Sequence, residues 1–131
     1  MPLKLSLKPG ETFVVNGAVV RNGDRRGVLL LENRARVLRE KDILHPEDAQ
    51  TPAERAYFAV MQLYLLGAQS GPVHEAAVAT LADLLQHAQA PDVRDRIIDI
   101  SASIAAGESY RALTTCRKLM QGQAETEASA A

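Results

Sequence analysis

The sequence predicts an α+β fold, in which a small N-terminal antiparallel β-sheet of four to five short strands precedes a bundle of about four helices. Three observations lead to this prediction. Apolar and polar residues alternate near the start, glycine turn signals divide the first 40 residues into short segments, and apolar residues recur at helical spacing after residue 52. We therefore place a basic β domain at 1–45, a helical domain at 46–121 and a disordered tail at 122–131.

Turn signals separate the strands within the first 40 residues. Leucines alternate with lysine and serine in "LKLSLK" (3–8), which gives that strand one apolar face. Asn16-Gly17 predicts a two-residue hairpin, because both central residues of a type I′ turn need a positive φ angle. The segment "GVLLLEN" (27–33) is apolar enough to predict a strand buried on both faces, and "RARVLRE" (34–40) supplies the last strand.

Between two of these strands lies "RNGDRRG" (21–27), which we interpret as the tip of a hairpin because Asn22-Gly23 is a turn signal. A turn of this kind does not require arginine. Arg25 and Arg26 are therefore either contacts for a partner or solvated charges on a turn.

The helical half begins after a linker at 45–52. Thr51 is a suitable N-cap, Pro52 suits the first helical position, and Glu54 completes a capping box. This first helix ends at Gly67 and is apolar on nearly every side, so we expect it to be the central buried helix. Three further helices are predicted up to about residue 120, the first of them at roughly 73–88.

The chemistry-bearing residues of the helical half form no catalytic or metal-binding motif. The three histidines, one in the linker and two in the helical half, are not spaced from one another or from Cys116 as metal ligands are. These histidines are His45, His74 and His87. Cys116 shares a predicted helix face with apolar residues, which favours a small buried side chain over a nucleophile. Three acids near one helix face favour a solvated surface over a cation site, and they are Asp92, Asp95 and Asp99. We expect no enzyme activity, no cofactor and no metal.

Nothing in the composition predicts export or a membrane span. A single cysteine cannot form an internal disulfide, and no apolar run approaches the ~20 residues of a membrane helix. The opening "MPLKLSLKPG" does not have the continuous apolar core of a signal peptide. We expect a cytoplasmic protein that does not bind a membrane.

The net charge of −1 conceals a strong asymmetry between the two halves. Residues 1–41 hold nine basic and four acidic residues, a net of +5, whereas residues 42–131 hold six basic and twelve acidic residues, a net of −6. Such halves suit different partners, because a basic surface attracts polyanions and an acidic one repels them.

The candidate RNA-binding residues are the cations that the predicted sheet and its turns would display. They are Lys4, Lys8, Arg21, Arg25, Arg26, Arg34 and Arg36, with Arg34 and Arg36 on one face of the last strand. Arginine offers phosphate a planar pair of donors. The alternative is a plain solvated sheet, because the only aromatic residue of this half, Phe13, is expected in the core and not available for base stacking.

Several segments, in register, resemble the FlbT family of flagellar biosynthesis regulators. They are "LKPGE", "NGAV", "NGDRRG", "LREKDI" and "TPA", and the likeness continues more loosely to about residue 120. The resemblance implies a cytoplasmic protein that binds the 5′ untranslated region of flagellin mRNA and represses translation or promotes decay, although some members act positively. It also implies links to the small helical protein FlaF and to flagellin. A weaker similarity to the CsrA regulators, in the opening strands and turns, concerns the fold alone.

Two hypotheses about function follow. In the first, the basic β face binds the flagellin mRNA leader. In the second, the chain is an interaction module, a chaperone or adaptor, whose helical half binds flagellin or FlaF and affects mRNA indirectly. The acidic helical half and the shortage of exposed aromatic residues favour the second. A homodimer through the β domain is a further expectation, since so small a sheet is near the limit of independent stability.

Overall fold

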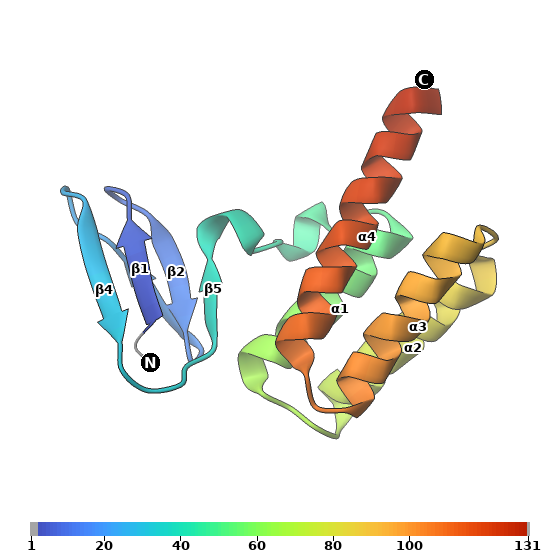
Figure 1. Cartoon of the computed structure of the whole chain (residues 1–131), viewed down its shortest axis with the longest axis horizontal. Helices are drawn as coiled ribbons and strands as arrows, with labels where there is room; N and C mark the ends of the chain where they lie inside the picture. The colour runs from blue at the N-terminus through green and yellow to red at the C-terminus, as the bar shows by residue number, and fades with distance from the viewer. Residues whose placement is uncertain (1–2, 131) are drawn as a thin grey trace. The chain divides into compact units, whose positions relative to one another are not determined.

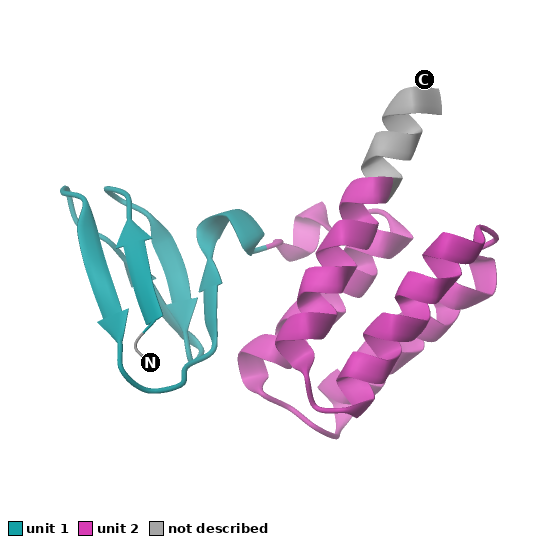
Figure 2. Ribbon diagram, viewed as in Figure 1, with its two compact units in different colours: residues 1–43 teal, residues 44–131 magenta. Residues whose placement is uncertain are grey.

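The computed structural model describes residues 3–130, with side chains up to Gly122, and divides into two compact units (Figures 1 and 2). Residues 1–43 belong to the β unit and residues 44–131 to the helical unit. The strands are β1 (Leu3–Leu7), β2 (Thr12–Val15), β3 (Ala18–Arg21), β4 (Gly27–Leu31) and β5 (Val37–Arg39). The helices are α1 (Pro52–Leu66), α2 (Pro72–His87), α3 (Pro91–Ala105) and α4 (Ser109–Ala130), preceded by the short 3-10 turns η1 (Glu40–Asp42) and η2 (Pro46–Asp48). The predicted α+β fold class is confirmed.

The five strands form two antiparallel sheets, whereas the sequence predicted one. One sheet consists of β1 and β4, and the other has the order β3-β2-β5. The two sheets share a single small core. It consists of the buried Leu5, Leu7 and Phe13 with the partly buried Val15, Leu29, Leu31 and Val37 packed against them. Phe13 is therefore in the core, as predicted.

The turn predictions have opposite outcomes. Asn16-Gly17 joins β2 to β3 as predicted, with φ angles of 50° and 85°. The hairpin tip predicted at Asn22-Gly23 is wrong, because β3 and β4 belong to different sheets and residues 22–26 cross from one sheet to the other. A turn signal is local, whereas the partner of β4 is the distant strand β1.

The prediction that residues 27–33 are buried on both faces is also wrong. Leu29 and Leu31 of β4 pack on the core, whereas Val28 and Leu30 are 59% and 58% exposed. The reason is that the β1–β4 sheet has a partner sheet on one face only.

The last strand is shorter than predicted. Only Val37–Arg39 pairs with β2, and the segment that contains Arg34 and Arg36 is an irregular connection. There the Arg36 backbone N–H donates to Asn16 Oδ1 at 2.8 Å, and the Asn16 N–H donates to the Arg36 carbonyl at 2.8 Å. The chain is thus tied to the Asn16 turn before its pairing with β2 begins.

In the helical unit, successive helices run antiparallel (Figure 1), and α1 packs against both α2 and α4. The predicted capping box begins α1. Thr51 Oγ1 accepts from the Glu54 N–H at 3.1 Å, and the Glu54 carboxylate accepts from the Thr51 N–H at 2.9 Å. Gly67 ends the helix in the left-handed region. The prediction of a central buried helix is confirmed, since eight residues of α1 are buried.

Two further predictions concern the helices: a disordered tail after the last helix, and the absence of a membrane span. The α4 backbone extends to Ala130, but the side chains beyond Gly122 lie outside the described residues, so the disordered tail at 122–131 stays a prediction. No described helix is both long and apolar enough to cross a bilayer.

Candidate nucleic-acid interface

The segment that crosses from β3 to β4, residues 22–26, is held in place by hydrogen bonds of the Asn22 side chain and of the Gly23 backbone. Asn22 Nδ2 donates to the Lys8 carbonyl at 2.7 Å and to the Arg25 carbonyl at 2.9 Å. In addition, the Gly10 N–H donates to the Gly23 carbonyl at 2.9 Å. The segment is thereby fixed to the turn between β1 and β2, with Arg25 at its exposed tip. A backbone segment that is placed in advance loses less entropy when it binds a ligand.

Beside this segment, Glu11 and Arg39 form an ion pair within the β unit. Arg39 Nη2 lies 3.0 Å from Glu11 Oε1, and the two side chains are 31% and 12% exposed. The same guanidinium donates to the Ser6 carbonyl. The pKa of the Glu11 carboxyl is lowered, chiefly because the Lys8 backbone N–H donates to it at 2.9 Å; partial burial opposes this shift, and Arg39 reinforces it. Arg39 is therefore engaged inside the unit.

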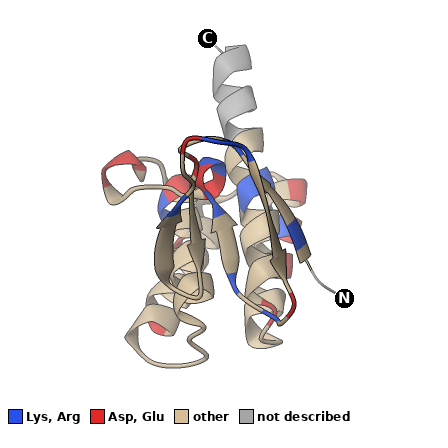
Figure 3. Ribbon diagram, turned by 90° about the vertical axis from the view of Figure 1, so that its left-hand side faces the viewer, with Lys and Arg blue, Asp and Glu red and all other residues tan. Residues whose placement is uncertain are grey.

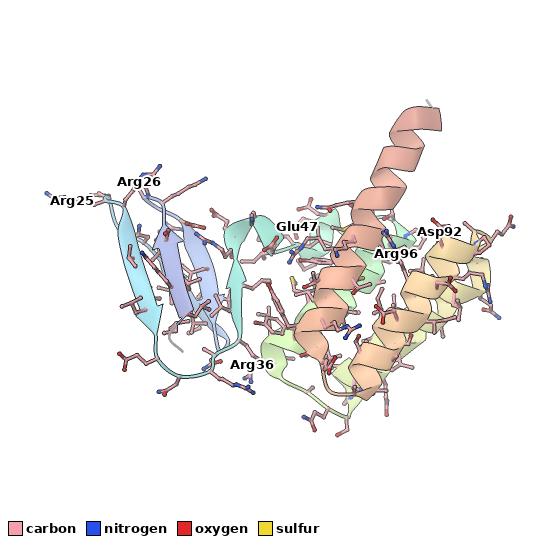
Figure 4. The ribbon with its side chains drawn as sticks, in the orientation of Figure 1. Arg25, Arg26, Arg36, Glu47, Asp92 and Arg96 are labelled. Carbon is pink, nitrogen blue, oxygen red and sulfur yellow. The ribbon has the colours of Figure 1, made fainter. Side chains whose placement is uncertain are left out.

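The seven nominated cations do not share one face of a sheet. Strand register places four of them at one end of the β unit, which we call the Arg25 end: Lys8, Arg21, Arg25 and Arg26. Two lie at the opposite end, the Arg36 end: Arg34 and Arg36. Figure 4 shows this separation for Arg25, Arg26 and Arg36. The seventh, Lys4, lies on β1 opposite Leu30.

The predicted basic sheet face is thus replaced by basic loops at the two ends of the unit (Figure 3). The outer face of the β1–β4 sheet is mixed instead, because the exposed apolar side chains Val28 and Leu30 of β4 occupy it beside Lys4 and Ser6 of β1. At the Arg25 end all four cations are exposed, and within the described residues none of them lies within ion-pair distance of a carboxylate. Exposed cations that make no ion pair can contact phosphate without first breaking one.

Aromatic residues do not contribute to this surface. Phe13 is 2% exposed, as expected for core. The exposed ring of Tyr110 belongs to the helical unit, where its centroid lies 5.3 Å from that of Tyr64. The Arg25 end is therefore suited to phosphate contacts and not to base stacking.

The helical unit contains the cysteine, histidine and aspartate side chains that were weighed above as catalytic or metal-binding candidates. Cys116 is buried, as predicted, and desolvation raises the pKa of its thiol to about 12, which suppresses the reactive thiolate. His87 is exposed, with Nδ1 2.8 Å from the Asp83 carbonyl. Asp99 lies 3.7 Å from Arg111 across two helices. Among the described residues, no group of three or more metal-ligating side chains comes together.

Sequence reasoning missed Asn22 and the pair of Glu11 with Arg39. Asn22 was assigned to a turn, but its side chain binds a carbonyl 14 residues away. The partners Glu11 and Arg39 are 28 residues apart. No local signal joins residues at such separations, because only the pairing of β2 with β5 brings the last two together.

Comparison with known proteins gives a consistent set of relatives. Residues 3–127 match the family described as "Flagellar protein FlbT". The probable flagellum biosynthesis repressor protein FlbT of Caulobacter sp. (strain K31) is 53% identical over 121 residues, covering 92% of each chain. The flagellum biosynthesis repressor protein FlbT of Caulobacter vibrioides (strain ATCC 19089 / CIP 103742 / CB 15) is 50% identical over 125 residues, 95% of this chain and 89% of the relative. The probable repressor of the same name from Rhodopseudomonas palustris (strain TIE-1) is 34% identical over 125 residues, 95% of this chain and 97% of the relative. No solved structure matches the chain.

Proposed function

Because the chain belongs to the FlbT family and has a regulatory role in flagellum biosynthesis, we propose that it regulates by binding the 5′ untranslated region of flagellin mRNA in the cytoplasm. Binding masks the ribosome site or holds the leader in a form that nucleases attack, so translation falls or decay rises. The protein acts by occupancy and catalyses no reaction.

The observation that carries this proposal is the Arg25 end of the β unit. Its four exposed cations make no ion pair within the described residues, and Asn22 and the Gly10–Gly23 hydrogen bond hold the segment that presents two of them. Arginine binds phosphate oxygens in pairs, and a fixed loop presents this geometry at a small entropic cost. The proposed contacts are to the RNA backbone, so preference for the leader comes from its folded shape.

Fluorescence anisotropy with the flagellin leader RNA and a scrambled RNA of equal length tests this proposal. Four phosphate contacts to a single strand predict that affinity falls roughly 50-fold between 50 and 200 mM salt, through release of counterions. We expect the leader to bind more tightly than the scrambled RNA. Equal affinity for both RNAs, or affinity that salt leaves unchanged, would contradict the proposal.

A second candidate function is supported by exposed apolar side chains of the helical unit. Leu66 at the end of α1 is 63% exposed, and Tyr110 at the start of α4 is 53% exposed. Apolar residues on helix ends can receive a helix of a partner protein, for which flagellin and FlaF are the candidates. Titration calorimetry of the full chain with each protein tests this. Tyr110→Ala should weaken binding, and no heat with either partner would exclude this candidate.

A further inference from the structure

Strand β4 has an open edge and an apolar outer face. Among the described residues it pairs with β1 alone. Its outward side chains Val28 and Leu30 are more than half exposed. An exposed strand edge with apolar neighbours is a template for pairing with another strand, and proteins usually protect such edges with charges, proline or a bulge. Residues 27–31, "GVLLL", contain none of the charged or proline residues that would do so.

The other edge of the same sheet is partly occupied. Arg39 donates to the carbonyl of Ser6 on β1, so this carbonyl faces away from β4. Backbone groups alternate in direction along an antiparallel pair. Since Ser6 is opposite Val28, and Lys4 is opposite Leu30, the backbone groups of Val28 and Leu30 also face away from β1, toward the open edge. They are the groups that a further strand would bind.

We propose that this strand is β4 of a second copy of the chain, paired antiparallel about Leu29. A two-fold axis at Leu29 places Val28 of each copy opposite Leu30 of the other, so their outward backbone groups meet. The exposed side chains of Val28 and Leu30 then lie together on one face of a four-stranded sheet. The outer apolar face becomes continuous across the two copies.

Charge selects this register and this partner. Continued one residue past each strand end, pairing about Leu29 places Arg26 opposite Glu32 of the second copy, and the two-fold axis repeats this pair of opposite charges. A shift of two residues in one direction would place Arg26 opposite Leu30, and a shift in the other direction would place Glu32 opposite Val28. Both shifted registers lose the charge pair, and a shift of one residue would mismatch the faces.

Pairing unites the two basic ends that one copy keeps apart. The Arg25 end of one copy comes beside the Arg36 end of the other, and the two-fold axis repeats this arrangement at the opposite end of the strand pair. Each composite basic surface then takes Lys8, Arg21 and Arg25 from one copy and Arg34 and Arg36 from the other, whereas Arg26 is engaged with Glu32. An RNA site built in this way is incomplete in a single chain. This consequence rests on the proposed RNA binding, whereas the pairing itself does not.

Sedimentation equilibrium of the full chain tests the pairing. One strand pair is a small interface, so we expect a reversible dimer that is weak in comparison with standard interfaces. Arg26→Glu and Glu32→Arg should each weaken dimerisation about tenfold, because each affects two symmetric pairs and brings like charges together. The double variant should recover to within about twofold of the wild type. The matched control is Val19→Lys on the exposed edge strand β3, which should leave dimerisation unchanged.

Two results would overturn the pairing. One is a chain that stays monomeric up to millimolar concentration. The other is a double variant that dimerises as weakly as the single variants, since this would place Arg26 and Glu32 apart.

Subunit mixing tests the composite surface with the leader RNA as probe. Arg25→Gln and Arg36→Gln should each weaken RNA binding several-fold, and neither residue belongs to the charge pairs of the dimer. In a mixed dimer one surface carries both substitutions and the other carries neither. The mixture should therefore contain a fraction that binds as tightly as the wild type. A mixture that binds only as the average of its components would refute the composite surface. If the wild type binds no RNA while the charge exchange restores the dimer, the proposed function fails and the pairing stands.

Discussion

Asn22 controls the position of the arginines at the tip of the Arg25 end. One amide group binds the carbonyl of Lys8 on one side and the carbonyl of Arg25 on the other. The residue was expected to form a turn by its own backbone preference, and it acts instead by its side chain. This role depends on the fold, because Lys8 is 14 residues away.

Replacing Asn22 by alanine should loosen this segment. Loss of both hydrogen bonds should lower the free energy of unfolding of the β unit by about 1–2 kcal/mol, since each contributes about 1 kcal/mol. RNA affinity should fall as well, because the backbone that carries the arginines is no longer fixed. Urea unfolding followed by NMR of the β-unit amides measures the first effect. Asn33→Ala, in the exposed connection before β5, is the matched control and should change neither property.

Glu11 should make the stability of the β unit depend on pH. Its pKa in the folded chain is lowered from the ordinary value of 4.5. A lowered folded pKa means that the ionised carboxylate stabilises the fold, fully above the unfolded pKa, and that this contribution disappears as pH falls through the folded pKa. Wild type should therefore be more stable than Glu11→Gln at pH 7, and the difference should shrink as pH falls below 4.5.

The same amide signals in urea at pH 7 and at pH 3 measure this difference. Glu40→Gln, an exposed acid of the same unit, serves as the control. A difference between wild type and Glu11→Gln that is equal at the two pH values would show that the carboxylate charge has no part in it.

Cys116 should be inert in the folded protein. It is buried, and its pKa of about 12 leaves very little thiolate at neutral or mildly alkaline pH. We expect a thiol reagent such as Ellman's reagent to leave Cys116 unmodified at pH 8 in buffer and to modify it rapidly in denaturant. Rapid modification of the native chain would show that the α4 core opens.

At the scale of elements, local signals were reliable where local contacts decide. Asn16-Gly17 and the Thr51 capping box are complete within four residues, and both are as predicted. Strand pairing is a different matter. Asn22-Gly23 has the same sequence signal as Asn16-Gly17, yet β4 pairs with β1 because the leucines of both strands cover the same small core. The sequence of β4 does not show which residues face the core, because its outward residues Val28 and Leu30 are as apolar as its inward residues Leu29 and Leu31.

The cap of α1 provides a test at this scale. Thr51→Ala removes the acceptor for the Glu54 N–H and should destabilise the helical unit by about 1 kcal/mol. Thr51→Ser keeps the hydroxyl and should retain nearly full stability. Thermal unfolding followed by far-ultraviolet circular dichroism measures both variants. Equal loss in the two variants would show that the hydroxyl is not the stabilising group.

At the scale of the whole molecule, the charge asymmetry visible in the sequence coincides with the division into units. The boundary at residues 43 and 44 separates the basic segment from the acidic one. The sequence could nominate the cations but could not group them. Lys8 and Arg25 are 17 positions apart and share one end, whereas Arg26 and Arg34 are 8 positions apart and lie at opposite ends. Strand direction decides this, and it follows from the pairing of β1 with β4.

The central claim is that the Arg25 end of the β unit binds the leader RNA. The most direct measurement compares the leader affinity of the wild type with that of Arg21→Glu/Arg25→Glu, two exposed cations of this end that lie outside the charge pair of the dimer. The matched control is Arg96→Glu/Lys118→Glu, which reverses two exposed charges of the helical unit. We predict that the first variant loses at least about tenfold in affinity and has a shallower salt dependence, because phosphate contacts are lost. The control should bind nearly as the wild type does. Equal affinities for the wild type and the Arg21→Glu/Arg25→Glu variant would contradict the account.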